Sequence, residues 1–146
     1  MPTIHIQGVD LSYQESSIIT FDEGLIGFPG LKRMVIVRQS GIEPFLWLAS
    51  LDDASVAFLV VDPRQLFPDY KVEWQTVAPA HQLASEDDEA PLVLAMVLIA
   101  AEWKESSVNL RAPIFISPST MRGMQCALSD SPYRLDEPFP EEVVAA

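Results

Sequence analysis

Residues 45–63, which read FLWLASLDDASVAFLVVDP, decide the fold. Two apolar runs rich in strand-forming residues flank the short polar stretch 52–55, and this pattern is typical of a β-hairpin. The stretch contains no pattern of a catalytic nucleophile, a phosphate-binding loop or a metal site. The stretch whose structure is easiest to predict therefore indicates how the chain folds and not a reaction that it catalyses. We expect a binding protein rather than an enzyme.

The composition indicates a single folded domain with an acidic surface. The chain has 146 residues, of which 49% are hydrophobic, so it is long and apolar enough to bury a core. Its formal net charge of −12 opposes direct binding to nucleic acid or to anionic membranes, because both need clustered Lys and Arg. A basic protein partner is favoured electrostatically, although high net charge is also a common means of staying soluble.

Cysteine and histidine usage gives no sign of a disulfide, a metal site or a cofactor. Cys126 is the single cysteine, which suits a reducing compartment, and we expect it to be a buried structural thiol. His5 and His81 lie far apart without metal-ligand spacing. The start of the chain lacks a signal-peptide pattern, and the longest apolar run, 92–101, is about half of a membrane span. We therefore expect a soluble cytoplasmic protein.

Short strands separated by turn residues are expected on both sides of the hairpin. The apolar patterns predict strands over residues 4–9, 17–21, 31–39, 72–77, 92–101, 107–110, 114–117 and 123–129. The glycine-rich stretch 24–30 marks a turn, 78–83 fits either a short helix or a strand, and 86–89 is a solvated acidic loop. We predict an all-β barrel or sandwich with short loops over residues 1–130. A loosely attached, acidic, proline-rich tail is expected over 131–146.

Few residues suggest a functional site. Asp52 and Asp53 look like paired carboxylates, but Asp is common in hairpin turns, where it bonds its own backbone. Phe67, Asp69 and Tyr70 lie at a proline break, where aromatic residues either anchor a partner or pack the barrel mouth. No spacing indicates a nucleophile with its general base.

Several blocks of the chain, taken in order, resemble the flagellar assembly factor family called FliW. They are GLIGFPG at 24–30, the run 44–63, FPDY at 67–70, VNLRAPI at 108–114, and GMQ at 123–125 with the later Tyr133. The resemblance implies a small antiparallel β-barrel-like fold, with neither catalysis nor a cofactor. The sequence departs from the family pattern at Ala49, where glutamine is usual, and over 116–120. Either change can alter a contact with a partner.

The resemblance also implies two protein partners. Proteins of this family bind newly made flagellin in the cytoplasm. They also bind the carbon storage regulator, a small dimeric RNA-binding protein that represses flagellin translation. Secretion of flagellin then frees the factor to sequester the regulator, and translation resumes. Whether the two partners share a surface, and whether the protein forms oligomers, stays open at this point.

Candidate partner-binding residues follow from motif position and from the enrichment of aromatic residues at interfaces. They are Phe45, Trp47, Asp52, Asp53, Phe67, Asp69, Tyr70 and Asn109. Two other functions stay open. One is a secretion chaperone for flagellin without a role in translation. The other is a small β-barrel hydrolase or isomerase, which would need a pocket with convergent titratable groups.

Overall fold

The β-hairpin predicted at residues 45–63 lies at the centre of the fold. In the computed structural model, which describes residues 2–74, 90–129 and 131–144, β5 (Leu46–Ser50) pairs antiparallel with β6 (Ala57–Val61). The backbone N–H groups of Asp52 and Asp53 donate hydrogen bonds to Ser50 Oγ at 3.1 and 2.9 Å. The Asp53 carboxylate accepts hydrogen bonds from the N–H and the hydroxyl of Ser55. The hairpin prediction is confirmed, and these hydrogen bonds within residues 50–55 are local.

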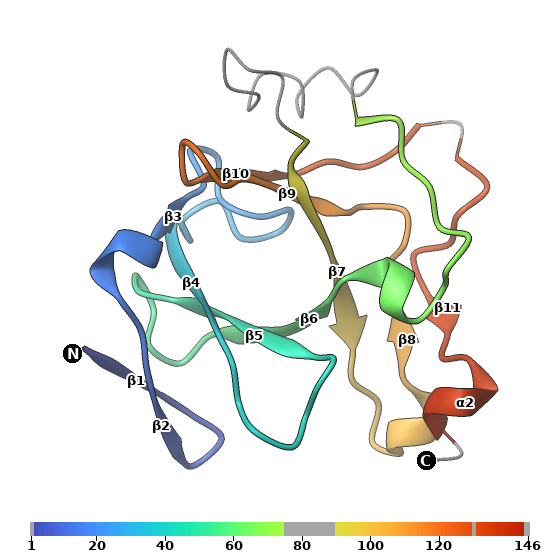
Figure 1. The fold of residues 1–146 in the computed structure, drawn as a ribbon, viewed down its shortest axis with the longest axis horizontal. Helices are drawn as coiled ribbons and strands as arrows, with labels where there is room; N and C mark the ends of the chain where they lie inside the picture. Colours follow the sequence, from blue (N-terminus) through green and yellow to red (C-terminus); the bar gives the residue numbers. More distant parts are fainter. Residues whose placement is uncertain (1, 75–89, 130, 145–146) are drawn as a thin grey trace.

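Within the described residues, nine further strands and four short helical turns surround this hairpin (Figure 1). The strands are β1 (Thr3–Ile6), β2 (Val9–Ser12), β3 (Ile19–Thr20), β4 (Arg33–Val37), β7 (Leu92–Leu98), β8 (Ser107–Val108), β9 (Ile114–Ser117), β10 (Arg122–Gln125) and β11 (Glu137–Pro138). The helical turns are η1 (Glu15–Ser17), η2 (Pro63–Gln65), η4 (Trp103–Glu105) and α2 (Glu141–Val144). No helix in this part of the chain is long and apolar enough to cross a membrane.

Seven of the described strands close into a barrel. Their order is β7-β6-β5-β4-β3-β10-β9, and β9 returns to β7 through three pairs centred on Val93↔Phe115. Neighbouring strands are antiparallel apart from β3 and β10, which run parallel at Thr20↔Arg122. The start of β7 pairs with β9 and its end pairs with β8, so β8 and β11 extend the sheet beyond the barrel. The all-β barrel is confirmed, with one parallel pairing among its strands.

Alternate residues of the barrel strands face two separate parts of the core. The inner cluster takes side chains from β3, β4, β5, β6, β7 and β9, including Met34, Leu48, Val60, Leu94 and Ile114. The intervening residues of β4 to β8 face outward into a second cluster, which is covered by β1, by residues 66–70 and by Phe139. Both faces of the β5–β6 sheet are therefore largely buried, which explains why both strands read as almost continuous apolar runs.

Closure of the barrel beside the parallel pairing depends on a glycine. A Cβ atom at Gly123 in β10 would lie 2.7 Å from Cε1 and Cζ of Phe21 and 3.2 Å from Cγ2 of Ile19. The first of these distances is shorter than real Cβ atoms adopt. A residue without a side chain thus lets β10 approach the fully buried ring of Phe21.

One predicted strand is wrong where it can be checked. Residues 71–74 join no ladder, although Lys71 and Glu73 are exposed while Val72 and Trp74 are half-buried, as the alternating pattern indicates. Val72 and Trp74 pack against outward-facing clusters, so their apolar side chains are covered without a ladder. The predictions for 75–77, 78–83 and 86–89 lie outside the described residues.

Several other predicted strands are shorter than expected. The pattern over 4–9 resolves into β1 and the first residue of β2, which form a separate hairpin. The strand at 92–101 ends at Leu98, the strand at 107–110 ends at Val108, and the strand at 123–129 ends at Gln125. Beyond β8 and β10, Leu110 and Cys126 are still buried although the ladder has stopped, whereas Ile99 beyond β7 is 56% exposed.

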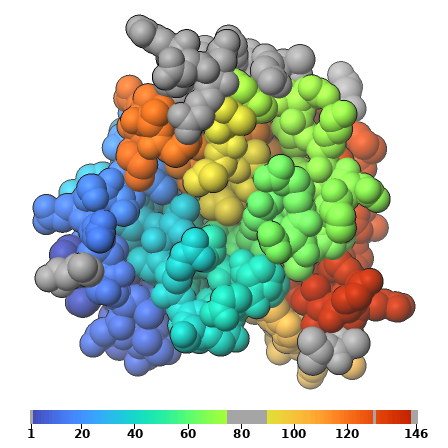
Figure 2. All heavy atoms as spheres, viewed as in Figure 1, coloured from blue at the N-terminus to red at the C-terminus, as the bar shows by residue number. Residues whose placement is uncertain are grey.

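The C-terminal segment is attached more firmly than the predicted loose tail. β11 pairs with β8, and the backbone N–H of Leu110 donates to the carbonyl oxygen of Arg134 at 3.0 Å. Phe139 is 7% exposed and belongs to the outward-facing cluster. Figure 2 shows this segment (red) beside the segment that follows β6 (green). Loose attachment is therefore wrong for residues 131–144, because a few well-placed apolar side chains are enough to dock a proline-rich, acidic stretch.

Candidate functional site

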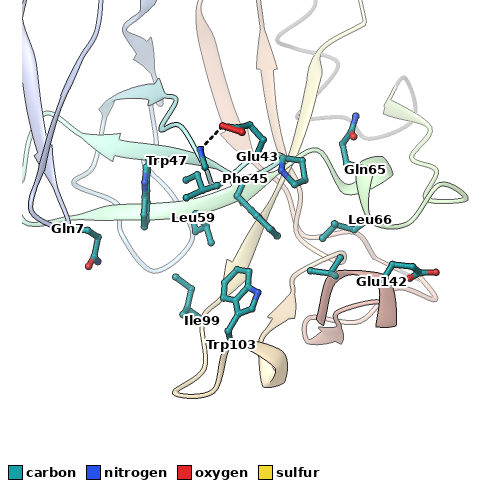
Figure 3. Close-up of a pocket in the computed structure, with 14 residues that line it drawn as sticks. Gln7, Glu43, Phe45, Trp47, Leu59, Gln65, Leu66, Ile99, Trp103 and Glu142 are labelled. Carbon is teal, nitrogen blue, oxygen red and sulfur yellow. Dashed lines mark hydrogen bonds between the residues drawn. The ribbon is translucent and has the colours of Figure 1, made fainter. Parts of the chain in front are cut away.

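A groove opens on the outward face of β5 and β6, below them in Figure 3, and encloses about 840 Å³. Its mostly apolar lining includes Phe45, Trp47, Leu59, Leu66, Ile99 and Trp103. We call it the outer-face groove. Its volume lies in the range of natural ligand pockets, about 300–1,000 Å³. Most of the side chains that line it are apolar, and few are ionisable.

The floor of the outer-face groove follows from the register of the central hairpin. Trp47 and Leu59 are paired directly across β5 and β6, so their side chains leave the same face of the sheet. The indole N–H of Trp47 donates to Gln39 Oε1 at 2.9 Å, which holds the ring in place. Among the described residues the β6–β7 ladder is restricted to Val60 and Val61 of β6. Leu59 and Ile99 lie outside these pairs, and both line the groove.

Three aromatic rings from distant parts of the chain form a cluster, and two of them, Phe45 and Trp103, line one wall of the groove. The rings of Phe45 and Trp103 meet edge to face with centroids 5.3 Å apart, and Trp103 meets Phe139 at 4.9 Å. Phe45 and Phe139 are themselves 5.9 Å apart. At the mouth, 41% of Trp103 and 56% of Ile99 are exposed to solvent. The wall is thus fixed on its inner side and leaves apolar surface open on its outer side.

The rim of the outer-face groove is acidic. Glu43 and Glu142 line it, and the wall segments 41–47, 99–105 and 141–143 together carry five glutamates and one lysine, a net charge of −4. Glu43 is anchored because its carboxylate accepts a hydrogen bond from the N–H of Gly41 at 2.9 Å (dashed line in Figure 3). The groove therefore combines an apolar floor with a negative edge.

The structure divides the eight predicted partner-binding residues among separate places. Phe45 and Trp47 line the outer-face groove, with 7% and 8% of their surfaces exposed. Asp52 and Asp53 lie at the β5–β6 turn, on the left in Figure 1, whereas the segment after β6 lies on the right. Asp52 Oδ2 accepts hydrogen bonds from the N–H groups of Lys32 and Arg33, both at 2.8 Å, and these bonds lower the pKa of Asp52. Asp52 thus ties the turn to β4.

The remaining four residues lie around the turn after η2. The Tyr70 hydroxyl donates to the carbonyl oxygen of Leu110 at 2.8 Å, and its ring lies 4.5 Å from that of Tyr133. Burial, and to a lesser extent Tyr133, raises the pKa of Tyr70 well above its usual value. Asn109 Oδ1 accepts hydrogen bonds from the two N–H groups of Arg111 and Ala112, so this side chain shapes a turn.

Phe67 and Asp69 complete this group. Phe67 is half-buried against the outward-facing cluster, and Asp69 is exposed. A partner-binding role for all eight residues stays a prediction. Asp69 is the member of this group whose side chain is open to solvent, so a partner can reach it without rearrangement of the fold.

Sequence reasoning missed Ile99, Trp103 and Val143, which also line the outer-face groove. Trp103 carried a usable signal, because a tryptophan within the polar turn 102–106 is an unusual place for a large apolar side chain. Ile99 and Val143 carried none, since they look like ordinary members of apolar runs.

Cys126 is buried, as predicted, beside Phe115. Burial raises the pKa of its thiol to about 11, so the reactive thiolate is scarce at neutral pH. Within the described part of the chain, no group of three or more His, Cys, Asp or Glu residues is arranged to hold a metal ion.

Fold and groove together define the class: a small closed β-barrel with an apolar, acid-rimmed groove on its outer surface. The family model described as FliW protein matches residues 7–139. The chain belongs to the FliW family.

Individual relatives agree along almost the whole chain. The flagellar assembly factor FliW of Caldanaerobacter subterraneus subsp. tengcongensis is 36% identical over 134 residues, covering 91% of this chain and 89% of that protein. Its namesake in Geobacter sulfurreducens is 34% identical over 130 residues, covering 89% and 80%. A crystal structure of the flagellar assembly factor FliW superposes with a TM-score of 0.81 at 26% identity, covering 97% of this chain and 99% of the other. The match therefore includes both the barrel and the C-terminal segment.

Proposed function

We propose that this chain is a cytoplasmic, non-enzymatic flagellar assembly factor that binds flagellin and the carbon storage regulator, and so couples flagellin translation to flagellin secretion. The observation that carries the proposal is the family match over residues 7–139, reinforced by relatives named flagellar assembly factors over about nine-tenths of the chain. Both partners are proteins, and the protein binds them without transforming either.

Physical features of the chain support a protein-binding role. The outer-face groove combines buried aromatic anchors with an exposed tryptophan, and tryptophan is enriched where binding energy concentrates at interfaces. The net charge of −12 favours approach of a basic RNA-binding protein, which must itself be positive to hold RNA. An acidic factor then competes with RNA for a positively charged partner.

The exchange of partners requires that flagellin and the regulator weaken each other's binding. If they share a surface, steric exclusion is sufficient. If they bind apart, a coupling free energy of about 1–3 kcal/mol, typical of allosteric proteins, changes affinity about 5- to 150-fold. The reciprocity of linkage requires the regulator to weaken flagellin binding by the same factor.

Isothermal titration calorimetry tests the proposal directly. The purified protein is titrated with the purified carbon storage regulator, then again after saturation with flagellin, and the two titrations are repeated in the opposite order. We expect binding of each partner alone and weaker binding of each in the presence of the other. Binding of flagellin without any binding of the regulator would reduce the function to that of a secretion chaperone.

A second measurement addresses the role of charge. The association rate with the regulator is followed by stopped-flow fluorescence as the salt concentration rises. We expect the rate to fall, since steering between opposite charges is screened beyond about 10 Å at 0.1 M salt. A rate that stays constant from low to high ionic strength would remove electrostatics from the proposal and leave the rest standing.

A further inference from the structure

We propose that the outer-face groove is the docking site for an amphipathic segment of a protein partner, with apolar side chains facing the groove and Lys or Arg at its flanks. The inference rests on the proposed function in one respect, that the partner is a protein. The location and the chemistry of the segment come from the groove itself.

The apolar half of the recognition comes from the shape and lining of the groove. A volume of about 840 Å³ accommodates several large side chains. The floor formed by Trp47 and Leu59 lies on the paired strands β5 and β6, and the walls come from Phe45, from the β7–β8 loop and from α2. Successive anchors on one face of an amphipathic helix, spaced three or four residues apart, fill grooves of this kind.

The groove also leaves apolar surface in contact with water, which is where a partner gains most. Ile99 is 56% exposed and Trp103 41%, and both line the groove. Both side chains come from the loop that follows β7. Apolar side chains gathered at the mouth of an apolar groove mark an interaction surface, whereas single exposed ones scattered over a surface do not.

The charged half of the recognition comes from the rim. The three wall segments carry five glutamates and one lysine, Lys104. Glu142 of α2 and Glu43 of the β4–β5 loop lie on the groove itself, on different sides of its floor. A segment with apolar residues alone would leave these charges without partners at its edges. Basic residues at the flanks complement them and speed association.

The walls are prepared for binding before any partner arrives. Trp103 is held by Phe45 and Phe139, and the Trp47 indole is held by Gln39. Little side-chain freedom is then lost when a segment binds, and this preorganisation increases affinity.

Tryptophan indole signals provide a direct test on the full chain. The protein is labelled with ¹⁵N, and the three indole N–H signals of Trp47, Trp74 and Trp103 are followed by NMR. The probe is a synthetic amphipathic helix of Leu and Lys, and its matched control has Glu in place of every Lys. We expect the Leu/Lys peptide to shift the signals of Trp47 and Trp103. Trp74, which packs against the cluster of Phe115 and Cys126 away from the groove, is the internal control.

Substitutions with matched controls locate the site. Ile99→Lys puts a charge into the groove mouth and is compared with Ile26→Lys, since Ile26 is 55% exposed and does not line the groove. Glu142→Lys reverses a rim charge and is compared with Glu23→Lys on an exposed turn. We expect Ile99→Lys to weaken peptide binding about tenfold or more, and Glu142→Lys to weaken it a few-fold with a smaller salt dependence. Both controls should stay within about twofold, in line with other exposed sites.

Four results would overturn the proposal. They are absence of Leu/Lys peptide binding, equal binding of the Leu/Glu peptide, a shift of the Trp74 signal in place of those of Trp47 and Trp103, and equal losses in the groove variants and their controls. The indole experiment uses the unmodified chain, so it decides the matter even where a variant folds poorly.

The same variants separate this inference from the proposed function. If the unmodified protein binds neither flagellin nor the regulator, the proposed function fails, and the peptide experiment still decides the docking chemistry. If it binds either partner and Ile99→Lys leaves both affinities unchanged, the proposed function stands and the groove is not its docking site. Loss of one affinity and retention of the other would assign the groove to the partner that is lost.

Discussion

Replacing Tyr70 by Phe should change the stability of this protein in a way that depends on pH. The substitution keeps the ring beside Tyr133 and removes the hydroxyl that donates to the carbonyl oxygen of Leu110 at 2.8 Å. Loss of one such hydrogen bond costs about 1 kcal/mol of unfolding free energy at neutral pH. The expected result at pH 7 is therefore a variant about 1 kcal/mol less stable than the unmodified protein.

Alkaline pH should reverse this difference. Burial raises the pKa of Tyr70 above the ordinary tyrosine value of about 10, so above pH 10 the unfolded chain loses the phenolic proton while the folded chain keeps it. The folded state then binds one more proton than the unfolded state, and stability falls as pH rises, by about 1.4 kcal/mol per pH unit for one proton. Between pH 9 and pH 11 the unmodified protein loses about 1.4 kcal/mol through this group alone. Tyr70→Phe lacks this loss.

Urea unfolding at a series of pH values measures the effect. The unfolding free energies of the two proteins should converge above pH 10 and cross near pH 11, where the titration loss equals the hydrogen-bond gain. Other groups that titrate in this range, among them Cys126 with its raised pKa of about 11, contribute equally to both proteins and cancel in the difference. A difference that stays constant from pH 7 to pH 11 would show that the hydroxyl ionises as easily in the folded state as in the unfolded one, contrary to its burial.

Three further predictions concern the barrel, the C-terminal segment and the hairpin turn. Gly123→Ala should lower the unfolding free energy by about 1–3 kcal/mol in urea, because the added Cβ overlaps a buried ring, whereas Gly30→Ala, where a Cβ meets nothing within 4 Å, should be nearly neutral. Phe139→Ala should cost about 3–5 kcal/mol and Leu135→Ala, at 56% exposure, less than about 1 kcal/mol; equal small costs would show that the C-terminal segment does not support the fold. Asp52→Asn should flatten the acid end of the stability profile, because a carboxylate with a lowered pKa contributes stability that is lost as pH falls below about 4. Melting temperatures that change with pH by the same amount in both proteins between pH 2 and pH 6 would refute this last prediction.

The central hairpin was predictable because the residues that specify it lie close together in the sequence. Two apolar runs and a turn rich in Asp and Ser decide the pairing of β5 and β6, and Asp53 and Ser50 close the turn with bonds to their near neighbours. The same reasoning located β4 and β9 within a residue or two, since their β-branched runs are bounded by Gly and Pro. Buried Cys126 followed from its place in an alternating apolar run.

Residues 71–74 show that an alternating pattern alone is not sufficient to predict a strand. Their alternation of exposed and half-buried side chains is real, but alternation alone does not decide whether a neighbouring strand pairs with the segment, and Val72 and Trp74 pack on side-chain clusters instead. The C-terminal segment shows the reverse case. Its composition is that of a tail, yet Phe139 docks because Phe45 and Trp103 form a site for it.

The sequence by itself determined that this is an all-β protein built around one hairpin, since hydrogen bonding and side-chain alternation within a short stretch decide such elements. Only the tertiary structure decided the parallel contact of β3 with β10, the closure of β9 onto β7, and the outer-face groove. The groove unites Trp47, Trp103 and Val143, which are separated by tens of residues, and no local pattern encodes which apolar side chains meet. Apolar burial is non-directional, so the choice among possible contacts is made when the whole barrel closes.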